Sequence, residues 1–218
     1  MIELTYSSIP EWLSAKRGLI SGGRMGSLKV APRKKGDINA ETWAVVAEQL
    51  TDEDPREGID WKTPLERGTF LEEEALQTVS NFTGVEIQKL DTVIWKLEKD
   101  SEISSSPDGA TADRKIVVET KCLDSKNHLQ MILSDDPLPK EYEWQAVQYF
   151  LVNNVAEEVW IAFYDPRFKD PRQRLAIFKV TREDVKDQID RNKEVIEKTI
   201  SNIASIKEQI LAKYPKEK

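Results

Sequence analysis

The short run IVVETK, at residues 116–121, constrains the fold of this chain more than any other stretch. Its β-branched residues predict a strand that begins buried, and the side chains of a strand alternate between its two faces. Val117, Glu119 and Lys121 therefore share one face, and Cys122 turns inward from the other. The pattern predicts one face suited to a core and one face that carries a carboxylate beside an ammonium.

An aspartate lies upstream of this strand, in the polar turn SSSPDG at residues 104–109. Ten residues separate Asp108 from Glu119, and the two carboxylates become neighbours if the segments that carry them pair as strands. Neighbouring carboxylates bind a divalent cation well and otherwise repel each other. With Lys121 beside them, the set suits metal-assisted phosphodiester hydrolysis, in which the lysine orients or deprotonates the attacking water or stabilises charge on phosphorus. The backbone carbonyl of Thr120 is a further oxygen ligand.

An ordinary edge strand with a surface Glu–Lys pair has the same spacing, so the metal-site interpretation needs support from elsewhere in the chain. The numbers of cysteine and histidine residues limit the metal sites and the catalytic groups that the chain can form. One cysteine excludes a disulfide within the chain, and one cysteine with one histidine cannot build a zinc site. A metal would therefore need oxygen ligands, as magnesium, manganese and calcium do. Catalysis by a serine–histidine or cysteine–histidine pair is excluded unless His128 serves alone.

The net charge of −7 argues against a surface that coats nucleic acid generally, but a local basic groove is compatible with it. Basic residues gather at 29–35 and at 167–174, and ordinary solvated surface is the alternative interpretation of both clusters. No apolar run approaches the length of a membrane span, and the N-terminus lacks the pattern of a secretory signal. We therefore expect a cytoplasmic protein without a membrane contact.

Hydrophobic periodicity predicts helices in the first third of the chain, a mixed sheet in the middle and a long helix at the end. Helical spacing places Trp43 inward on a helix capped by Asn39, and Phe70 inward on a helix that Gly84 ends. The Asp108–Gly109 turn predicts a hairpin-like link between the strands on either side of it. The expected helices cover residues 9–19, 38–51, 63–84, 141–154 and 181–214, and the expected strands cover residues 85–98, 101–106, 115–121, 157–165 and 174–180.

This order of elements predicts an α/β or α+β fold, with a central mixed β-sheet flanked by helices, in one domain that spans residues 1–218. Its parts are a helical region to about residue 84, a catalytic sheet core at about 85–180 and a helix at about 181–214. The last helix has an apolar stripe at heptad-like spacing, for which packing onto its own core and contact with another subunit are both open. The stripe consists of Val185, Ile189, Ile196, Ile200, Ile203 and Ile210.

Six landmarks follow one another along the chain: EWLSAKRGLISGG, APRKKG, RGTFLEEEA, SSPDG with VETKC, WQAVQYFLVN, and FYDPRF. In type and order they resemble the PD-(D/E)xK nuclease superfamily, and within it the phage lambda-type alkaline exonucleases of recombination, the YqaJ-like nucleases. The likeness runs from about Trp12 to the final strands. It implies a restriction-endonuclease-like core.

The resemblance implies a role for each matching residue. Asp108 and Glu119, with the Thr120 carbonyl, would bind Mg²⁺, with Mn²⁺ as an alternative and two ions as the expected number. Glu72 would reach the second metal or its water, Lys121 would be the catalytic lysine, and Gln145 would help position the nucleophile. The implied catalytic residues are Glu72, Asp108, Glu119, Lys121 and Gln145.

The resemblance also implies a pocket for the 5′-phosphate of the digested strand. Ser106 matches a hydroxyl beside the acid motif, and Lys16 or Arg17 matches a basic position. The family's second hydroxyl falls on Gly23, which is a departure from the pattern. Either Ser21 substitutes, or backbone N–H groups of the segment 22–23 bind the phosphate.

Two further DNA contacts are implied. Arg33 matches a proline-arginine loop and is expected to contact DNA. After VETKC the family has an arginine that grips the strand, where this chain offers Lys126 or His128.

The implied activity is Mg²⁺-dependent digestion of duplex DNA in the 5′→3′ direction, which releases mononucleotides and leaves a 3′ single strand for strand annealing. A ring-shaped homotrimer around DNA and a single-strand annealing protein as partner are also implied, in the host cytoplasm if the chain is phage-encoded. Two alternatives are a structure- or site-specific DNA endonuclease on the same core and a non-catalytic DNA-end-binding protein. The complete set of catalytic residues argues against the second alternative.

Overall fold

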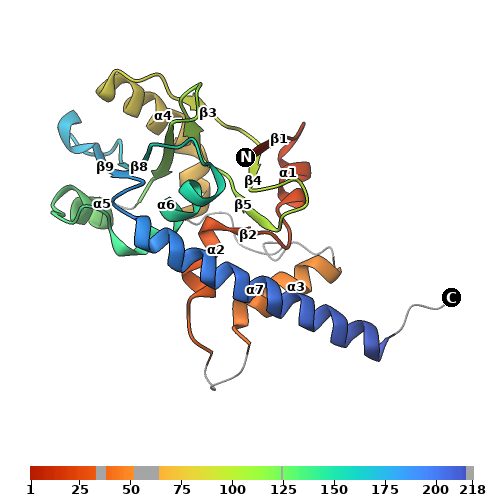
Figure 1. Ribbon diagram of the computed structural model, residues 1–218. Helices are drawn as coiled ribbons and strands as arrows, with labels where there is room; N and C mark the ends of the chain where they lie inside the picture. The colour runs from red at the N-terminus through yellow and green to blue at the C-terminus, as the bar shows by residue number, and fades with distance from the viewer. Residues whose placement is uncertain (33–37, 52–63, 124, 215–218) are drawn as a thin grey trace.

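A computed structural model describes residues 1–32, 38–51, 64–123 and 125–214 of the chain, and its strands form two mixed sheets (Figure 1). The larger sheet has the order β3-β6-β7-β8-β9, and the smaller has the order β1-β4-β5-β2. The predicted mixed α/β fold is confirmed, although its strands are divided between two sheets. The strands are β1 (Ile2–Thr5), β2 (Ile20–Ser21), β3 (Gln88–Lys89), β4 (Val93–Lys96), β5 (Ile103–Ser105), β6 (Gly109–Ala110), β7 (Ile116–Lys121), β8 (Glu158–Tyr164) and β9 (Leu175–Thr181).

Helices surround the two sheets and come from every part of the described chain (Figure 1). The expected helix beginning at residue 40 is capped as predicted, because Asn39 Oδ1 accepts a hydrogen bond of 2.7 Å from the Glu41 backbone N–H. Gly84 follows α4 at a φ of +70°, a conformation that favours glycine. The helices are α1 (Ile9–Ala15), α2 (Gly22–Leu28), α3 (Ala40–Thr51), α4 (Pro64–Thr83), α5 (Ser125–Ile132), α6 (Lys140–Val152), α7 (Lys186–Lys213) and a short 3₁₀ turn (Pro171–Gln173).

Strand β7 is buried on both of its faces. On one face Val117 belongs to the main hydrophobic core together with Val147 and Phe150 of α6. On the other face Val118 packs in a second cluster with Leu76 of α4. Cys122 is buried as predicted. The face that carries Glu119 and Lys121 is therefore also part of a core over its first half, and only its end is polar.

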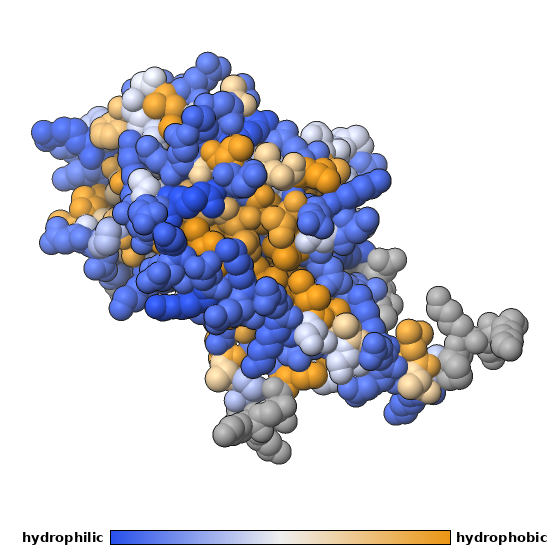
Figure 2. Space-filling model, in the orientation of Figure 1, coloured by the Kyte–Doolittle hydropathy of each residue, from blue (hydrophilic) through white to orange (hydrophobic). Residues whose placement is uncertain are grey.

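The long helix α7 packs along α6, α3 and α2, and lies across the front of the view in Figure 1. Ile189, Ile196 and Ile203 from its predicted stripe are buried in the main core. In the same view, Figure 2 shows a mostly hydrophilic surface with a hydrophobic band beside α7. The stripe thus serves the chain's own core. Among the described residues, no helix has the length and apolar character that a membrane crossing requires.

The hairpin was predicted with the wrong partner strand for β7. The strand at residues 103–105 is β5, which belongs to the smaller sheet and pairs with β4 and β2. The antiparallel partner of β7 is the short strand β6, which begins directly after Asp108. The first third of the chain is also less helical than predicted, since β1 and β2 supply two of the four strands of the smaller sheet.

Four local expectations were also wrong or incomplete. Trp43 is 53% exposed and Phe70 is 85% exposed, so neither side chain faces inward as predicted; on α3 Val46 of the predicted stripe is buried, together with Val45. The glycine-rich segment after Ser21 forms helix α2, and residues 125–132 form helix α5, neither of which was predicted. Helix α2 contacts α6 and α3, and α5 contacts β8 and β9, so both helices form in a tertiary context that local preference does not include.

Candidate active site

Pairing of β6 with β7 places Asp108 beside Glu119. Gly109 lies opposite Val118 in an antiparallel register, so the residue before Gly109 lies next to the residue after Val118. The backbone N–H and the hydroxyl of Thr120 both donate to Asp108 Oδ2, each at 2.7 Å. These two bonds hold the aspartate at the end of β7.

The Glu119 carboxylate is buried and has a donor on each oxygen. The Lys121 ammonium donates to Oε1 at 2.6 Å, because residues two apart on a strand share a face. The hydroxyl of Tyr149, on α6, donates to Oε2. Burial lowers the pKa of Lys121, but the charges and hydrogen bond of its acidic neighbours, Glu119 first, raise it to a net value above the usual one. Lys121 is therefore an ammonium in this site.

Glu72, on α4, belongs to the same acidic cluster. Its pKa is raised chiefly by burial, with the charge of Glu119 adding to the effect and Lys89, at 3.9 Å, opposing it. The pKa of Asp108 is raised well above its usual range by burial first, and then by the charges of Glu119 and Glu72. Glu119 thus raises the pKa values of both Glu72 and Asp108, and a cation bound among these carboxylates would relieve their repulsion.

The donor set fits a hard divalent cation, since it consists of carboxylate oxygens and the Thr120 backbone carbonyl. Among the described residues, however, no group of three acidic, histidine or cysteine side chains is arranged as a finished metal site. Both Glu119 oxygens and one Asp108 oxygen are turned toward protein donors instead. A cation here would share Glu119 with Lys121 or take over its Oε1.

Gln145 reaches this cluster through Tyr149. Both lie on α6, and Gln145 Nε2 donates to the Tyr149 hydroxyl at 3.3 Å. Burial, and then the charges of Glu119 and Asp108, raise the pKa of Tyr149 well above its usual value, so the hydroxyl keeps its proton. Sequence reasoning missed Tyr149; the available signal was its spacing of four residues from Gln145, which places both on one side of a helix.

The serines expected to bind phosphate lie at one edge of the smaller sheet. Strands β2 and β5 are parallel, with Ser21 opposite Ser104, so their carboxyl ends point the same way. Ser106 follows β5, and its carbonyl oxygen lies 3.3 Å from the Tyr149 hydroxyl. Gly22 begins α2 where this helix approaches α6 closely, since a Cβ on Gly22 would lie 3.4 Å from the Gln145 Cα.

The basic residues expected to bind DNA or its 5′-phosphate differ in their surroundings, and some of them lie outside the described residues. The Lys16 ammonium, at the end of α1, lies 4.0 Å from the centre of the Trp12 ring, and Arg17 is half-buried beside it. Arg33 and the side chain of Lys126 lie outside the described residues. His128 is fully buried, with Nε2 2.9 Å from the Gln173 carbonyl oxygen, so the expectation that it could replace a strand-gripping arginine is wrong.

The basic cluster at residues 167–174 holds its own loop together. The Arg167 side chain forms two hydrogen bonds to the buried Asp165, at 2.7 and 2.9 Å, and Arg172 pairs with Asp170 at 2.6 Å. Arg174 Nε donates to the Phe168 carbonyl at 2.7 Å. Because these arginines are paired within their own loop, ordinary surface is favoured over a DNA-binding groove for this cluster.

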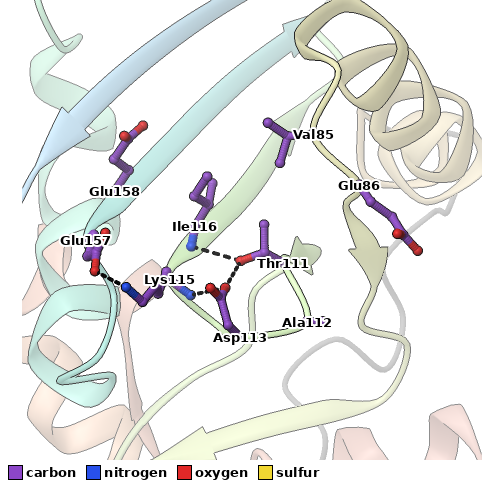
Figure 3. Close-up of a pocket in the computed structure, with 9 residues that line it drawn as sticks. All are labelled: Val85, Glu86, Thr111, Ala112, Asp113, Lys115, Ile116, Glu157 and Glu158. Carbon is purple, nitrogen blue, oxygen red and sulfur yellow. Dashed lines mark hydrogen bonds and ion pairs between the residues drawn. The ribbon is translucent and has the colours of Figure 1, made fainter.

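A surface hollow of about 430 Å³ lies away from the acidic cluster, around the turn between β6 and β7 and the start of β8 (Figure 3). Its polar groups bind one another: Thr111 donates to Asp113 at 2.7 Å, and Lys115 pairs with Glu157 at 2.5 Å. None of the predicted site residues lines this hollow. Its interactions close the turn, and the acidic cluster lies at the other end of β7.

Comparison with solved structures places the fold among alkaline exonucleases. An alkaline exonuclease from Laribacter hongkongensis, LHK-Exo, is 19% identical, with a TM-score of 0.78 over 94% of this chain and 97% of that chain. The same protein in complex with dAMP gives 20% identity and a TM-score of 0.77, over the same shares of both chains. A phage-related exonuclease from Haemophilus somnus 129PT is 16% identical, with a TM-score of 0.59 over 86% of this chain and 95% of that chain.

No curated protein matches the sequence significantly. Residues 11–156 match the YqaJ-like viral recombinase domain, and this span includes the acidic cluster, Lys121, Gln145 and Tyr149. Family and fold agree with the resemblance inferred from the sequence motifs. The chain belongs to the family of YqaJ-like viral recombinase domains.

Proposed function

We propose that this chain is a metal-dependent exonuclease that degrades duplex DNA from an end. That it is a nuclease acting on DNA follows from its family. The proposal of metal dependence rests on one observation. Glu72, Asp108 and Glu119 interact electrostatically beside the Lys121 ammonium at the end of β7. Clustered carboxylates with an adjacent lysine suit phosphodiester hydrolysis.

The proposed roles follow from the positions of the groups. Asp108, Glu119 and the Thr120 carbonyl would hold Mg²⁺, or Mn²⁺ as an alternative, and Glu72 would hold a second ion or its water. Bound there, the cation would polarise the scissile phosphate and lower the pKa of a bound water. Lys121 orients the attacking water or stabilises charge on the phosphate, and Gln145 helps to position that water.

The DNA end is proposed to bind at the serine edge beside this site. Ser106 and either Ser21 or the N–H groups of residues 22–23 would contact the 5′-phosphate, with Lys16 or Arg17 as the basic partner. The parallel pairing of β2 and β5 supports this proposal, because it brings the two serine segments to one edge next to α6. A 5′→3′ direction with mononucleotide products follows if the phosphate is held there.

The assembly is part of the proposal. A homotrimeric ring in the host cytoplasm would allow basic residues to line a channel while the acidic surplus covers the outside. A protein that anneals single strands would receive the 3′ strand that digestion exposes. The single nuclease domain of residues 1–218 would be one subunit of that ring.

Digestion of a linear duplex with a labelled 5′ end, beside a covalently closed circle, tests the function. We expect labelled mononucleotide from the linear DNA in Mg²⁺, no release in EDTA, and an intact circle. Cutting of the circle would make the chain an endonuclease of the same superfamily. If folded protein binds the ends but leaves both substrates intact at every cation concentration, the chain is an end-binding protein and the proposal is wrong.

A further inference from the structure

The hydroxyl of Tyr149 lies where three separate segments of the site meet. It is buried in the main core and donates to Glu119 Oε2 on β7. Gln145 Nε2 approaches it at 3.3 Å from the previous turn of α6, and the Ser106 carbonyl oxygen lies 3.3 Å away in the segment that follows β5. One hydroxyl thus touches the proposed metal-binding strand, the proposed water-positioning residue and the proposed phosphate-binding segment.

The groups around the Tyr149 hydroxyl determine which of them accepts its hydrogen bond. A hydroxyl has one proton to donate and can accept from other donors. Of its two acceptors, the charged Glu119 carboxylate attracts that proton more strongly than the neutral Ser106 carbonyl. The amide of Gln145 then donates to the oxygen lone pair. The arrangement fixes Glu119 by its Oε2 and leaves Oε1 directed at Lys121, where a cation would also bind.

We propose that Tyr149 is a positioning residue that holds the Glu119 carboxylate in the orientation needed for cation binding and keeps it in register with Gln145 and the Ser106 segment. The inference rests on the proposed function, because it acts through the same metal-binding carboxylate. It adds a residue that neither the sequence motifs nor the chemistry of the acids identifies. An outer partner of a metal ligand typically changes metal affinity or activity by about 10–100-fold when it is removed.

Substitution Tyr149→Phe removes the hydroxyl and keeps the ring that fills the core. We expect Mg²⁺ or Mn²⁺ to bind about 10–100-fold more weakly to this variant, measured by calorimetric titration of the full chain without DNA. Tyr164→Phe is the matched control, since it removes another tyrosine hydroxyl that donates to a glutamate, in this case Glu74 at 2.7 Å, outside the acidic cluster. We expect its cation affinity to equal that of the unmodified chain.

A double-mutant cycle separates positioning from general damage to the fold. If Tyr149 acts through Glu119, then adding Tyr149→Phe to Glu119→Gln lowers cation affinity no further, because the carboxylate it positions is already gone. Thermal unfolding of the same four proteins checks the fold. If Tyr149→Phe alone lowers the unfolding midpoint, the double variant is expected to recover part of it, since no buried carboxylate is then left without its second donor.

The outcomes distinguish this inference from the proposed function. Cation affinity of folded Tyr149→Phe within about twofold of the unmodified chain overturns the positioning role and leaves the nuclease proposal intact. Tyr149→Phe that lowers cation affinity by the same factor in the presence and in the absence of Glu119 also overturns the positioning role, because the effect would then be a general structural one. An unmodified chain that binds no divalent cation and cleaves no DNA overturns the proposed function and this inference with it.

Discussion

The Lys121 ammonium lies 2.6 Å from Glu119 Oε1, on the same face and at the end of a strand whose first half is buried. A buried carboxylate is stable only if it is paired and hydrogen-bonded, and here the lysine supplies the charge while Tyr149 supplies a second donor. The lysine and a cation would therefore share one acidic group. The proposed roles of Lys121 in cleavage and of Glu119 in cation binding can therefore be tested separately.

Replacement of Lys121 by methionine is expected to lower the cleavage rate by about 10²–10³-fold, the usual effect of losing a group that transfers a proton or stabilises developing charge. Cation affinity should stay the same or rise, because a competing positive charge is removed. Single-turnover rates at saturating Mg²⁺ and calorimetric titration measure the two effects. Lys115→Met, at the other end of β7 and paired with the exposed Glu157, is the control. A parallel fall in rate and cation affinity would contradict the separation of roles.

Substitution of either proposed metal-binding acid, as Asp108→Asn or Glu119→Gln, is expected to abolish cleavage in Mg²⁺ and leave binding of DNA ends largely intact. The reason is that, in the proposed function, the acids hold the cation while other residues hold the DNA. End binding can be followed by fluorescence anisotropy in EDTA. Glu73→Gln, an exposed acid next to Glu72 on α4, should keep full activity. Full activity in either acid variant would remove the metal-site hypothesis.

Two glycines of α2 differ in their surroundings and give a matched pair. A Cβ on Gly22 would lie 3.1 Å from the Gln148 Cβ and 3.4 Å from the Gln145 Cα, whereas nothing lies within 4 Å of a Cβ on Gly26. Gly22→Ala should therefore push α2 away from α6, destabilise the fold by about 1–3 kcal/mol and slow cleavage. Gly26→Ala should be neutral or stabilise the helix by up to about 1 kcal/mol. Chemical denaturation and cleavage assays test both; equal behaviour of the two variants would show that the contact has no effect.

The buried Asp165 predicts a specific dependence of stability on pH. Burial tends to raise its pKa, but hydrogen bonds from Arg167 and Ser125 outweigh it and hold the pKa at about 2, against a usual value of 3.8. A depressed carboxyl pKa stabilises the fold above the unfolded value and loses that contribution as the pH falls toward 2. Asp165→Asn should cost about 2 kcal/mol of unfolding free energy at pH 7, and the gap to the unmodified chain should shrink below pH 4.

Asp170, a half-buried acid whose arginine partner is exposed, is the control for this effect. Its pKa is also about 2, first because of hydrogen bonds from Arg172, but that arginine side chain is 89% exposed. Solvent screens such a pair, so Asp170→Asn should change stability much less than Asp165→Asn. Urea unfolding of the two variants between pH 3 and pH 7 compares them. A gap for Asp165→Asn that does not change with pH would contradict the assignment.

The phosphate pocket gives the last prediction. Removing the 5′-phosphate from a linear duplex should slow digestion, and Ser106→Ala should reduce the difference between phosphorylated and unphosphorylated ends. The expected reason is loss of a hydroxyl that contacts the phosphate. Initial rates on paired substrates measure the preference. Equal rates of the unmodified chain on both ends would remove the pocket from the proposal and leave the hydrolysis unaffected.

Much of the catalytic strand could be predicted from the sequence, because the period of a strand is a local property. Alternation alone placed Glu119 and Lys121 on one face and turned Cys122 inward. The neighbourhood of Asp108 and Glu119 required only that two short segments pair, and β6 and β7 do so. The partner of the hairpin was predicted wrongly, since the assignment of β5 and β7 to different sheets is made by packing and is not visible in either local pattern.

Tertiary structure decided the rest of the site. Glu72 is one acid in a run of three, and only the packing of α4 brings its charge to Asp108 and Glu119. The hydrophobic periodicity of α6 made Tyr149 a core residue, and nothing local shows that its hydroxyl meets a carboxylate from a strand 30 residues away. The sequence by itself determined which residues of β7 share a face and which chemistry they suit, because these depend on neighbours along the chain. Which of those groups meet depends on how helices and sheets pack, which is a property of contacts distant in sequence.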